Sequence, residues 1–225
     1  MSVLVVGSSP DSLGAAVRDA LQARALRVVT AGITGEERYL DVTDPDNCKD
    51  VILRTRPKQI VVTAGINHGF TLRAEGLRGA MHEHMAVNYI GVITVLTAWL
   101  EARAEYSETS NGQFVAISSN SAHIARRGSM AYCASKAALS MALRCAARET
   151  AEEGLLVYGY EPGLLAGTPM TQQAAQDFPG PLHRMPGVGQ LGLSTRDFAR
   201  TIATNLQHPN QALHGAMLRL DAGEQ

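Results

Sequence analysis

A tyrosine and a lysine lie close together in an alanine-rich segment of this chain. In SMAYCASKAAL, residues 129–139, Tyr132 and Lys136 are four positions apart. In a helix this spacing puts both side chains on one face, about one turn apart. A phenol has an unperturbed pKa near ~10, and a neighbouring ammonium favours its ionised form. The pair therefore suits proton transfer, but it also occurs on ordinary solvated helices, so its surroundings must decide.

The composition describes an ordinary globular protein. The 225 residues are 45% hydrophobic and carry a formal net charge of -1, with no polybasic run that would indicate nucleic acid or a membrane surface as partner. Cys48, Cys133 and Cys145 show no C-x-x-C spacing, which argues against a disulfide scaffold or structural zinc and fits a reducing compartment. The apolar run at 3–6 is too short for a signal peptide or a membrane span, so we expect a cytoplasmic protein.

Short β-branched runs alternate with helical segments, and this alternation must position the tyrosine–lysine pair. Apolar runs predict strands at 2–7, 26–32, 38–42, 59–65, 112–119, 155–163 and 215–223. Helical periodicity and capping residues predict helices at 12–25, 44–56, 77–106, 131–153 and 194–207. The pattern is that of an α/β protein: one doubly wound domain over 1–225, with a mostly parallel sheet and helices on both faces.

Small and polar residues follow the predicted strands. In such a sheet the ligand lies beyond the carboxyl ends of the strands. The first strand leads into GSSPDSLG (7–14), a glycine-containing loop and helix start that suits a pyrophosphate, although an ordinary strand–helix turn would look the same. Further strands end at Asp41-Val42, at TAG (63–65), at Ser118-Ser119 and at Pro162-Gly163. Five such ends predict a nucleotide crevice.

These residues together resemble the short-chain dehydrogenase/reductase family over nearly the whole chain. The active-site pattern of that family is a serine, a tyrosine thirteen residues later and a lysine four further on, which Ser119, Tyr132 and Lys136 match. Asn88 in NYIG matches the helix asparagine of the family. LDV (40–42), TAG, PG (162–163) and LDAG (220–223) match further family elements in the same order. The resemblance implies a Rossmann-type fold.

The resemblance also implies hydride transfer between a nicotinamide and a ketone or secondary alcohol. Tyr132 would be the general acid or base, with its pKa lowered by Lys136 and the oxidised nicotinamide ring. Ser119 would donate a hydrogen bond to the substrate oxygen; Ser118 is the rival, but only Ser119 has the family spacing. Lys136 would also hold the nicotinamide ribose. Asn88 would place a water on a proton path to Lys136, unless its side chain simply bonds its own helix backbone.

The cofactor-binding residues are carried over from the family motifs. They are Gly7, Ser9, Leu13, Gly14, Asp41, Val42, Ala64, Gly65, Tyr132, Lys136, Pro162, Gly163 and Thr168. The chain departs from the family pattern in three places. The glycine loop is one residue longer and lacks its middle glycine, Thr63 replaces the usual asparagine, and Thr168 comes one residue late.

The end of the second strand bears on the choice between NADP and NAD. A carboxylate there would accept the adenosine ribose hydroxyls and reject a 2′-phosphate, but this chain has Thr30, Ala31 and Gly32. The absence of this carboxylate favours NADP over NAD. Against this, no arginine directly follows the strand, Arg38 suits a solvated surface position, and Asp11 would oppose an extra phosphate if it pointed inward.

The substrate is predicted only as a small carbonyl or alcohol compound. Residues 164–192 are rich in Pro and Gly and stand where the family has a substrate lid; Leu164, Met170, Phe178 and Met185 would either line an apolar pocket or pack the lid. His82 and His84 are two apart and diverge on a helix, so no metal site is expected. The helices at 77–106 and 131–153 resemble those that form dimers or tetramers in this family, so a homodimer or homotetramer is expected.

A second hypothesis is a nucleotide-binding sensor or scaffold that has the same fold and no turnover. The intact set of Ser119, Tyr132 and Lys136 favours the enzyme, whereas the altered glycine loop favours the sensor. A sugar epimerase of the extended branch fits poorly, because the chain has no room for a separate substrate domain.

Overall fold

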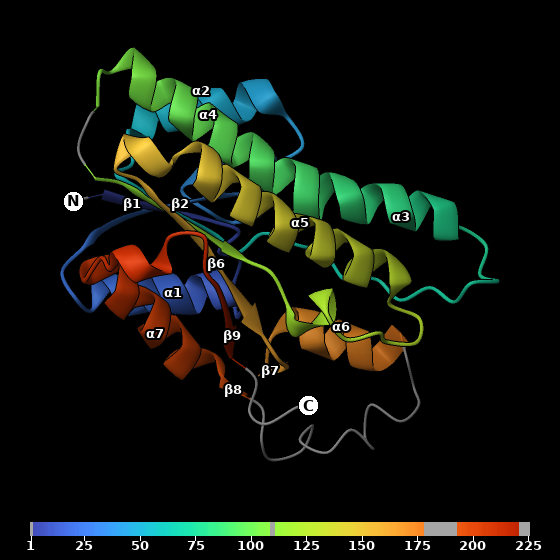
Figure 1. Cartoon of the computed structure of the whole chain (residues 1–225). Coiled ribbons are helices and arrows are strands. Elements are labelled where there is room, and N and C mark those ends of the chain that lie inside the picture. Colours follow the sequence, from blue (N-terminus) through green and yellow to red (C-terminus); the bar gives the residue numbers. More distant parts are fainter. Residues whose placement is uncertain (1, 109–110, 178–192, 221–225) are drawn as a thin grey trace.

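A seven-stranded parallel sheet forms the centre of the computed structural model, which describes residues 2–108, 111–177 and 193–220 (Figure 1). The strand order is β3-β2-β1-β4-β5-β6-β9, and every neighbouring pair is parallel. The strands are β1 Ser2–Val6, β2 Arg27–Gly32, β3 Arg38–Tyr39, β4 Gln59–Val62, β5 Gln113–Ile117, β6 Leu156–Pro162 and β9 Met217–Leu220. The predicted α/β, doubly wound Rossmann-type fold is confirmed.

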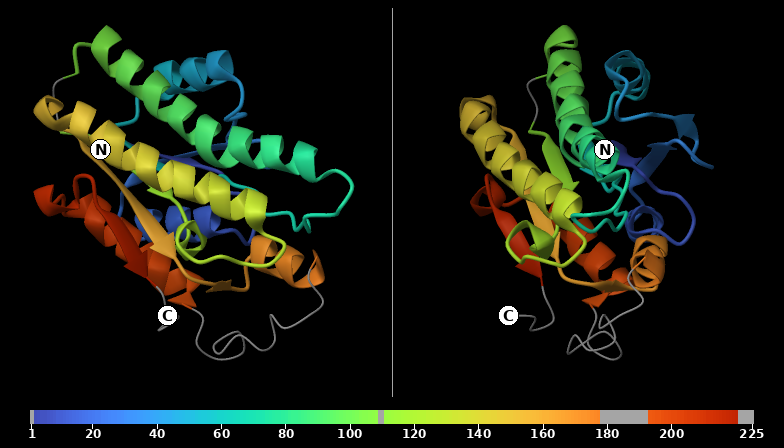
Figure 2. Two further views of the ribbon diagram at one scale, coloured as in Figure 1. Left: turned by 45° about the vertical axis from the view of Figure 1, so that its right-hand side comes forward. Right: turned by 90° about the vertical axis from the view of Figure 1, so that its right-hand side faces the viewer.

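Helices cover both faces of this sheet (Figure 2). On one face α1 (Leu13–Gln22) lies beside α7 (Thr195–Gln207), and both pack on side chains such as Val5 and Tyr158. On the other face lie α2 (Pro45–Thr55), α4 (Val92–Glu105) and α5 (Met130–Glu149). The strands are apolar throughout because both of their faces are buried.

The strand order reverses between β1 and β4. The chain leaves β1 toward β2 on one side and returns to β4 on the other, so the loops after these two strands diverge. A doubly wound sheet binds its ligand in the crevice opened at this point. The fold therefore places the glycine loop, the TAG segment and the end of β5 around one cleft.

The long helix predicted at 77–106 has three parts. They are α3 (Leu77–Met85), a π-helical segment (Ala86–Gly91) and α4. By length and composition Leu77–Glu105 could cross a membrane, but it packs along α5 and the sheet, and a buried core helix passes the same test. The π-helical turn contains Asn88, and π turns often mark functional sites.

Several predicted boundaries were wrong. The third strand ends at Tyr39 rather than 42, so Asp41 and Val42 lie in the following loop. Helix α5 ends at Glu149, short of the predicted 153. The segment predicted as a lid contains α6 (Pro169–Asp177), and Leu165–Ala166 (β7) pairs with Leu193–Ser194 (β8). Its remainder, 178–192 with Phe178 and Met185, lies outside the described residues.

Candidate active site

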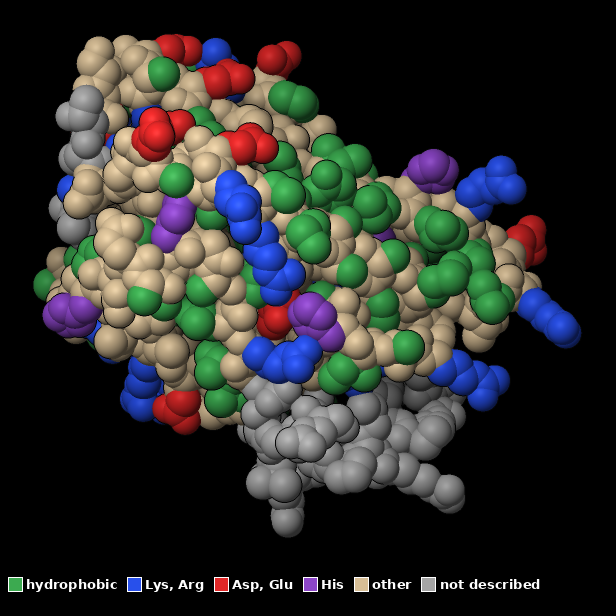
Figure 3. All heavy atoms as spheres, in the orientation of Figure 1, with side chains coloured by type: hydrophobic (Ala, Val, Ile, Leu, Met, Phe, Trp, Pro, Cys, Tyr) green, Lys and Arg blue, Asp and Glu red, His purple; other side chains and the backbone are tan. Residues whose placement is uncertain are grey.

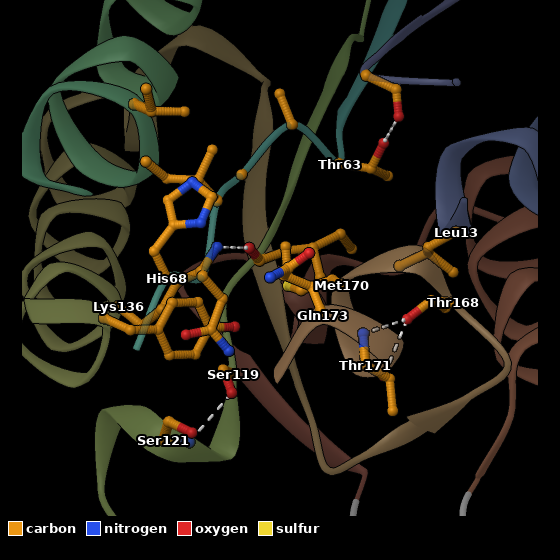
Figure 4. Close-up of a pocket in the computed structure, with 18 of the residues that line it drawn as sticks. Leu13, Thr63, His68, Ser119, Ser121, Lys136, Thr168, Met170, Thr171 and Gln173 are labelled. Carbon is orange, nitrogen blue, oxygen red and sulfur yellow. Dashed lines mark hydrogen bonds between the residues drawn. The ribbon is translucent and has the colours of Figure 1, made fainter. Parts of the chain in front are cut away.

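A cleft of about 1450 Å³ opens at the carboxyl ends of the strands. Figure 4 shows Ser119, Lys136 and His68 on one side of it, Leu13 and Thr63 on the other, and Met170 of α6 between them. Nearly all of the predicted site residues line this cleft. They are Gly7, Ser9, Leu13, Asp41, Val42, Ala64, Gly65, Ser119, Tyr132, Lys136, Pro162, Gly163 and Thr168. Gly14 and Asn88 do not line it.

Helix α5 and the end of β5 bring the three predicted catalytic side chains together. Tyr132 and Lys136 lie in the first two turns of α5, and both are buried. Lys136 Nζ donates a hydrogen bond to Ile117 O at 2.8 Å and lies 5.8 Å from the centroid of the Tyr132 ring. Ser119 is the second residue after β5 and is hydrogen-bonded to the Tyr132 side chain. A carbonyl oxygen that reached Tyr132 would therefore also reach Ser119.

Burial dominates the electrostatics of this group. It raises the pKa of Tyr132, against the lowering effect of the Ser119 hydrogen bond and of the nearby Arg126 charge. Burial also lowers the pKa of Lys136 to about 8. Lys136 is not among the groups that shift the pKa of Tyr132 in the cofactor-free protein, so the lowering expected from Lys136 together with the oxidised nicotinamide stays a prediction. Desolvation disfavours the ammonium form of Lys136, but with a pKa of about 8 this side chain is still mostly protonated at pH 7.

The choice between Ser118 and Ser119 follows from their hydrogen bonds. Ser118 Oγ donates to Lys136 O at 3.1 Å and pairs with Ser140 Oγ at 2.8 Å, which ties it to the α5 backbone. Ser119 Oγ accepts from Ser121 N at 3.1 Å and contacts the phenol (Figure 4). The geometry favours Ser119, as the spacing predicted.

Asn88 braces the backbone that follows β4. Its Nδ2 donates to Ile66 O at 2.9 Å and to Ser135 Oγ at 3.0 Å, while its Oδ1 accepts from Ile66 N at 2.8 Å. The alternative of a bond to its own helix is wrong. A Cβ on Gly65 would lie 3.2 Å from Asn88 Oδ1 and 3.4 Å from Lys136 Nζ, so only glycine leaves this corner open. Asn88 thus holds the TAG segment beside Lys136.

The glycine loop fits a phosphate group despite its altered spacing. Gly7 has a φ of 88°, and a Cβ there would lie 2.6 Å from Ala64 N. A Cβ on Gly14 would collide with Gly7 O, so Gly14 lets the helix start approach the strand end without itself lining the cleft. Ser8 Oγ is buried with no hydrogen-bond partner in the described structure, and the Ser12 side chain caps α1. Gly7, Ser9, Ser12 and Leu13 of this segment line the cleft, and the adjacent α1 N-terminus suits the phosphates of a dinucleotide.

Two residues predicted to contact the cofactor, Asp41 and Thr168, form hydrogen bonds with residues close to them in sequence. Asp41 Oδ1 accepts from Thr43 N at 2.9 Å and from Thr43 Oγ1 at 2.7 Å, because the strand ends earlier than predicted and the carboxylate closes the next turn. Thr168 Oγ1 pairs with Thr171 Oγ1 at 2.9 Å at the start of α6 (Figure 4). Both residues still line the cleft.

Three functional candidates escaped the sequence analysis. Glu36, in the loop after β2, lines the cleft and contacts the glycine loop. His68 lines the cleft, and its N–H donates to Nε2 of the buried His84 at 3.0 Å. Arg126 lines the cleft and donates from Nε to Ser121 Oγ at 3.1 Å. The only available signal was the pair of adjacent carboxylates in GEE (35–37), close behind a strand end.

The Glu36 carboxylate lies beside Gly32, the last residue of β2. The expected preference for NADP depended on the absence of a carboxylate at this strand end, and it stays a prediction. Metal-ligating side chains do not gather in groups of three or more anywhere in the part of the chain that is described.

A family model described as short chain dehydrogenase matches residues 2–178. The chain belongs to this family. Family membership confirms the resemblance on which the predicted class of enzyme rests. A human protein named (3R)-3-hydroxyacyl-CoA dehydrogenase is 30% identical to this chain over 75% of the chain. The matched region spans 63% of the length of that human relative.

Two solved structures share the fold of this short-chain dehydrogenase. One is described as ElxO with NADP bound, with a TM-score of 0.82, 21% identity and coverage of 99% and 98% of the two chains. The other is the ligand-free aldohexose dehydrogenase of Thermoplasma acidophilum, with a TM-score of 0.84, 22% identity and coverage of 99% and 92%. At this level of identity the likeness establishes the fold.

Proposed function

We propose that this short-chain dehydrogenase transfers a hydride between a nicotinamide cofactor, NAD(H) or NADP(H), and a ketone or secondary alcohol. The observation that carries the proposal is the hydrogen bond between Ser119 and Tyr132 at the mouth of the cleft, with Lys136 one turn further along α5. When bound, the cofactor supplies or accepts the hydride.

The chain's own residues manage the proton and the charge on the substrate oxygen. Tyr132 donates a proton to that oxygen during reduction and accepts one during oxidation. Ser119 donates a hydrogen bond to the same oxygen, whose negative charge grows in the transition state. Lys136 is close enough to Gly65 to hold the cofactor ribose. Asn88 acts as a positioning residue through the backbone of Ile66.

The residues fit a dinucleotide along the cleft. Gly7, Ser9 and Leu13 surround the loop where a pyrophosphate would lie, with the α1 N-terminus beside it. Ala64, Gly65 and the Pro162-Gly163 segment offer backbone without bulky side chains at the nicotinamide end. The structural neighbour that binds NADP supports a cofactor of this type.

The substrate class is supported by what the relatives are named to act on. One relative is named a (3R)-3-hydroxyacyl-CoA dehydrogenase and one structural neighbour an aldohexose dehydrogenase, so both are named for substrates that carry hydroxyl groups. In this chain, Met170 and His68 line the same cleft from α6 and from the loop after β4. They would contact the part of the substrate beyond its carbonyl carbon.

Replacement of Tyr132 by Phe tests the proposal. Turnover on a panel of ketones and secondary alcohols should fall by about 10³-fold or more, because the acid–base group is lost. Nucleotide binding, followed by nicotinamide fluorescence, should be nearly unchanged. The control is Tyr39→Phe, since Tyr39 is 63% exposed and does not line the cleft. Unchanged turnover in Tyr132→Phe would refute the proposal.

The sensor or scaffold is the second candidate, and the longer glycine loop favours it. Asp11 in that loop has a φ of 59°, in the left-handed region where Asp and Asn are more common than other non-glycine residues. If the wild type turns over no member of the panel, and nucleotide-dependent partner binding persists in Tyr132→Phe, the sensor is the better description.

We also propose a homo-oligomer and a cytoplasmic location. Exposed apolar side chains gather over the α3–α4 stretch and α5 (Figure 3), among them Met81, Ile90, Met130 and Met141. Burying this face against a second copy would remove it from water. Sedimentation analysis would determine the state.

A further inference from the structure

The geometry points to Glu36 as the residue by which this chain selects NAD(H) over NADP(H), its carboxylate standing in for the missing acidic side chain at the end of β2. The inference depends on the proposed function, because it requires a dinucleotide in the cleft. Glu36 lies four residues after the end of β2, so the spacing of the family motif does not identify it.

The position of the Glu36 carboxylate is set by two hydrogen bonds and by the space that Gly32 leaves for it. Ser8 N donates to Glu36 Oε1 at 3.1 Å, and Thr34 N donates to Glu36 Oε2 at 2.9 Å. A Cβ built on Gly32 would fall on Glu36 Oε1 and 2.7 Å from Glu36 Cδ. The three atoms nearest to that Cβ all belong to Glu36. The carboxylate therefore occupies the space of a side chain at position 32, the last residue of β2.

This place is where an adenosine ribose would reach the protein. Ser8 follows Gly7 in the loop after β1, and β2 pairs directly with β1. A dinucleotide with its pyrophosphate on that loop extends its adenosine ribose toward the end of β2. A carboxylate held there accepts hydrogen bonds from the 2′- and 3′-hydroxyls. Ser8 Oγ, buried without a partner in the described structure, lies in the same corner.

The charges around the cleft disfavour a 2′-phosphate. Asp41 lines the same region as Glu36, and Asp11 lies in the glycine loop. The cationic side chains among the described lining residues are Arg126, Arg127 and Lys136, and all three belong to the segment after β5. Arg38 is exposed on β3 and is not part of the lining. A 2′-phosphate next to Glu36 would therefore be repelled by the negative carboxylate. The described lining residues near Glu36 include no Lys or Arg that would offset this repulsion.

Direct binding of NADH and NADPH tests the inference without any turnover. Wild-type protein should bind NADH at least about tenfold more tightly than NADPH in a fluorescence titration at fixed ionic strength. Glu36→Gln should reduce that ratio by about tenfold, because the amide keeps one acceptor and loses the charge. The matched control is Glu37→Gln, which removes the same charge from an exposed neighbour that does not line the cleft.

A rescue variant tests whether a carboxylate at this place is enough for NADH preference, apart from the contribution of Glu36 to the structure of the glycine loop. Glu36→Ala should lose NADH preference, and Gly32→Asp combined with Glu36→Ala should regain it, because shortening Glu36 frees the space at position 32. Thermal denaturation of each variant reports folding.

The outcomes of the titration are distinct. Wild-type protein that binds NADPH as tightly as NADH, or a Glu36→Gln ratio equal to that of Glu37→Gln, overturns the inference and leaves the proposed function standing. Failure of the wild type to bind either cofactor overturns both. A restored preference in the double variant supports the inference.

Discussion

Replacement of Lys136 by methionine should make the folded protein more stable at neutral pH while it abolishes turnover. Lys136 is 3% exposed, and burial lowers its pKa from 10.5 to about 8. The ammonium form of Lys136 is therefore less favourable in the folded chain than in the unfolded chain. Methionine has a similar length and no charge, so it removes the desolvation cost and keeps most of the packing.

The magnitude follows from the difference between the two pKa values. Since one pKa unit corresponds to ~1.4 kcal/mol, burying the ammonium of Lys136 costs the folded state about 3 kcal/mol at pH 7. The variant also loses the hydrogen bond from Nζ to Ile117 O, a loss of about 1 kcal/mol. The net expected gain is about 2 kcal/mol in the free energy of unfolding, or about 4–8 °C in melting temperature for a chain of this size.

The pH dependence has a definite sign. Between a folded pKa of about 8 and an unfolded pKa of 10.5, the unfolded chain binds more protons, so the stability of the wild type rises with pH. From pH 7 to pH 9.5 the wild type should gain about 2 kcal/mol from this group, and its deficit against Lys136→Met should nearly vanish.

Urea denaturation at both pH values measures this difference. Lys58→Met serves as the control, because Lys58 is half-buried outside the cleft and its replacement should leave no comparable pH-dependent gap. A Lys136→Met protein that is less stable than the wild type at pH 7, with a gap that does not change by pH 9.5, would refute the reasoning. The buried ammonium would then be a net stabilising group through its hydrogen bonds.

Two further predictions concern the backbone around the cleft. Gly7→Ala should weaken NADH binding at least tenfold and lower stability by about 2 kcal/mol or more, because the new Cβ would lie 2.6 Å from Ala64 N at a φ of 88°. Gly35→Ala has a φ of 71° but no atom within 4 Å of its Cβ, so it should cost only about 1 kcal/mol, and equal losses for the two variants in calorimetry and titration would contradict the packing argument. Asn88→Ala should cost about 2–4 kcal/mol in denaturant unfolding, because Ile66 N and O lose their partners. A stability loss below about 0.5 kcal/mol, with nucleotide affinity unchanged, would show that Asn88 does not brace this segment.

The sequence alone determined the architecture, and the reason is periodicity. Apolar runs bounded by glycine can only be buried strands, and their alternation with capped helices permits little besides a parallel sheet covered on both faces. The spacing of Ser119, Tyr132 and Lys136 likewise predicted the candidate catalytic group, because the two α5 residues share one helix face whatever the rest of the chain does. The strand ends at 63–65 and 162–163 line the cleft, as their register in a parallel sheet requires.

Element ends and loop positions were decided only by the tertiary structure. Leu40 resembles a strand residue, but the ladder between β2 and β3 ends one residue earlier, and Asp41 turns to bond Thr43. The side chain of Asn88 bonds the backbone of Ile66, which lies in the loop after β4 and which no local pattern links to it.

Tertiary structure also decided the charges at the two ends of the cleft. Burial of the Tyr132 phenol is the largest influence on its pKa, and the depth of that burial depends on how α5 packs in the fold. Glu36 is separated from Ser8 by 28 residues, and its place next to Gly32 depends on the path of a loop. Sequence periodicity determines which faces are buried, whereas contacts between distant loops depend on the folded geometry and therefore leave no local signal.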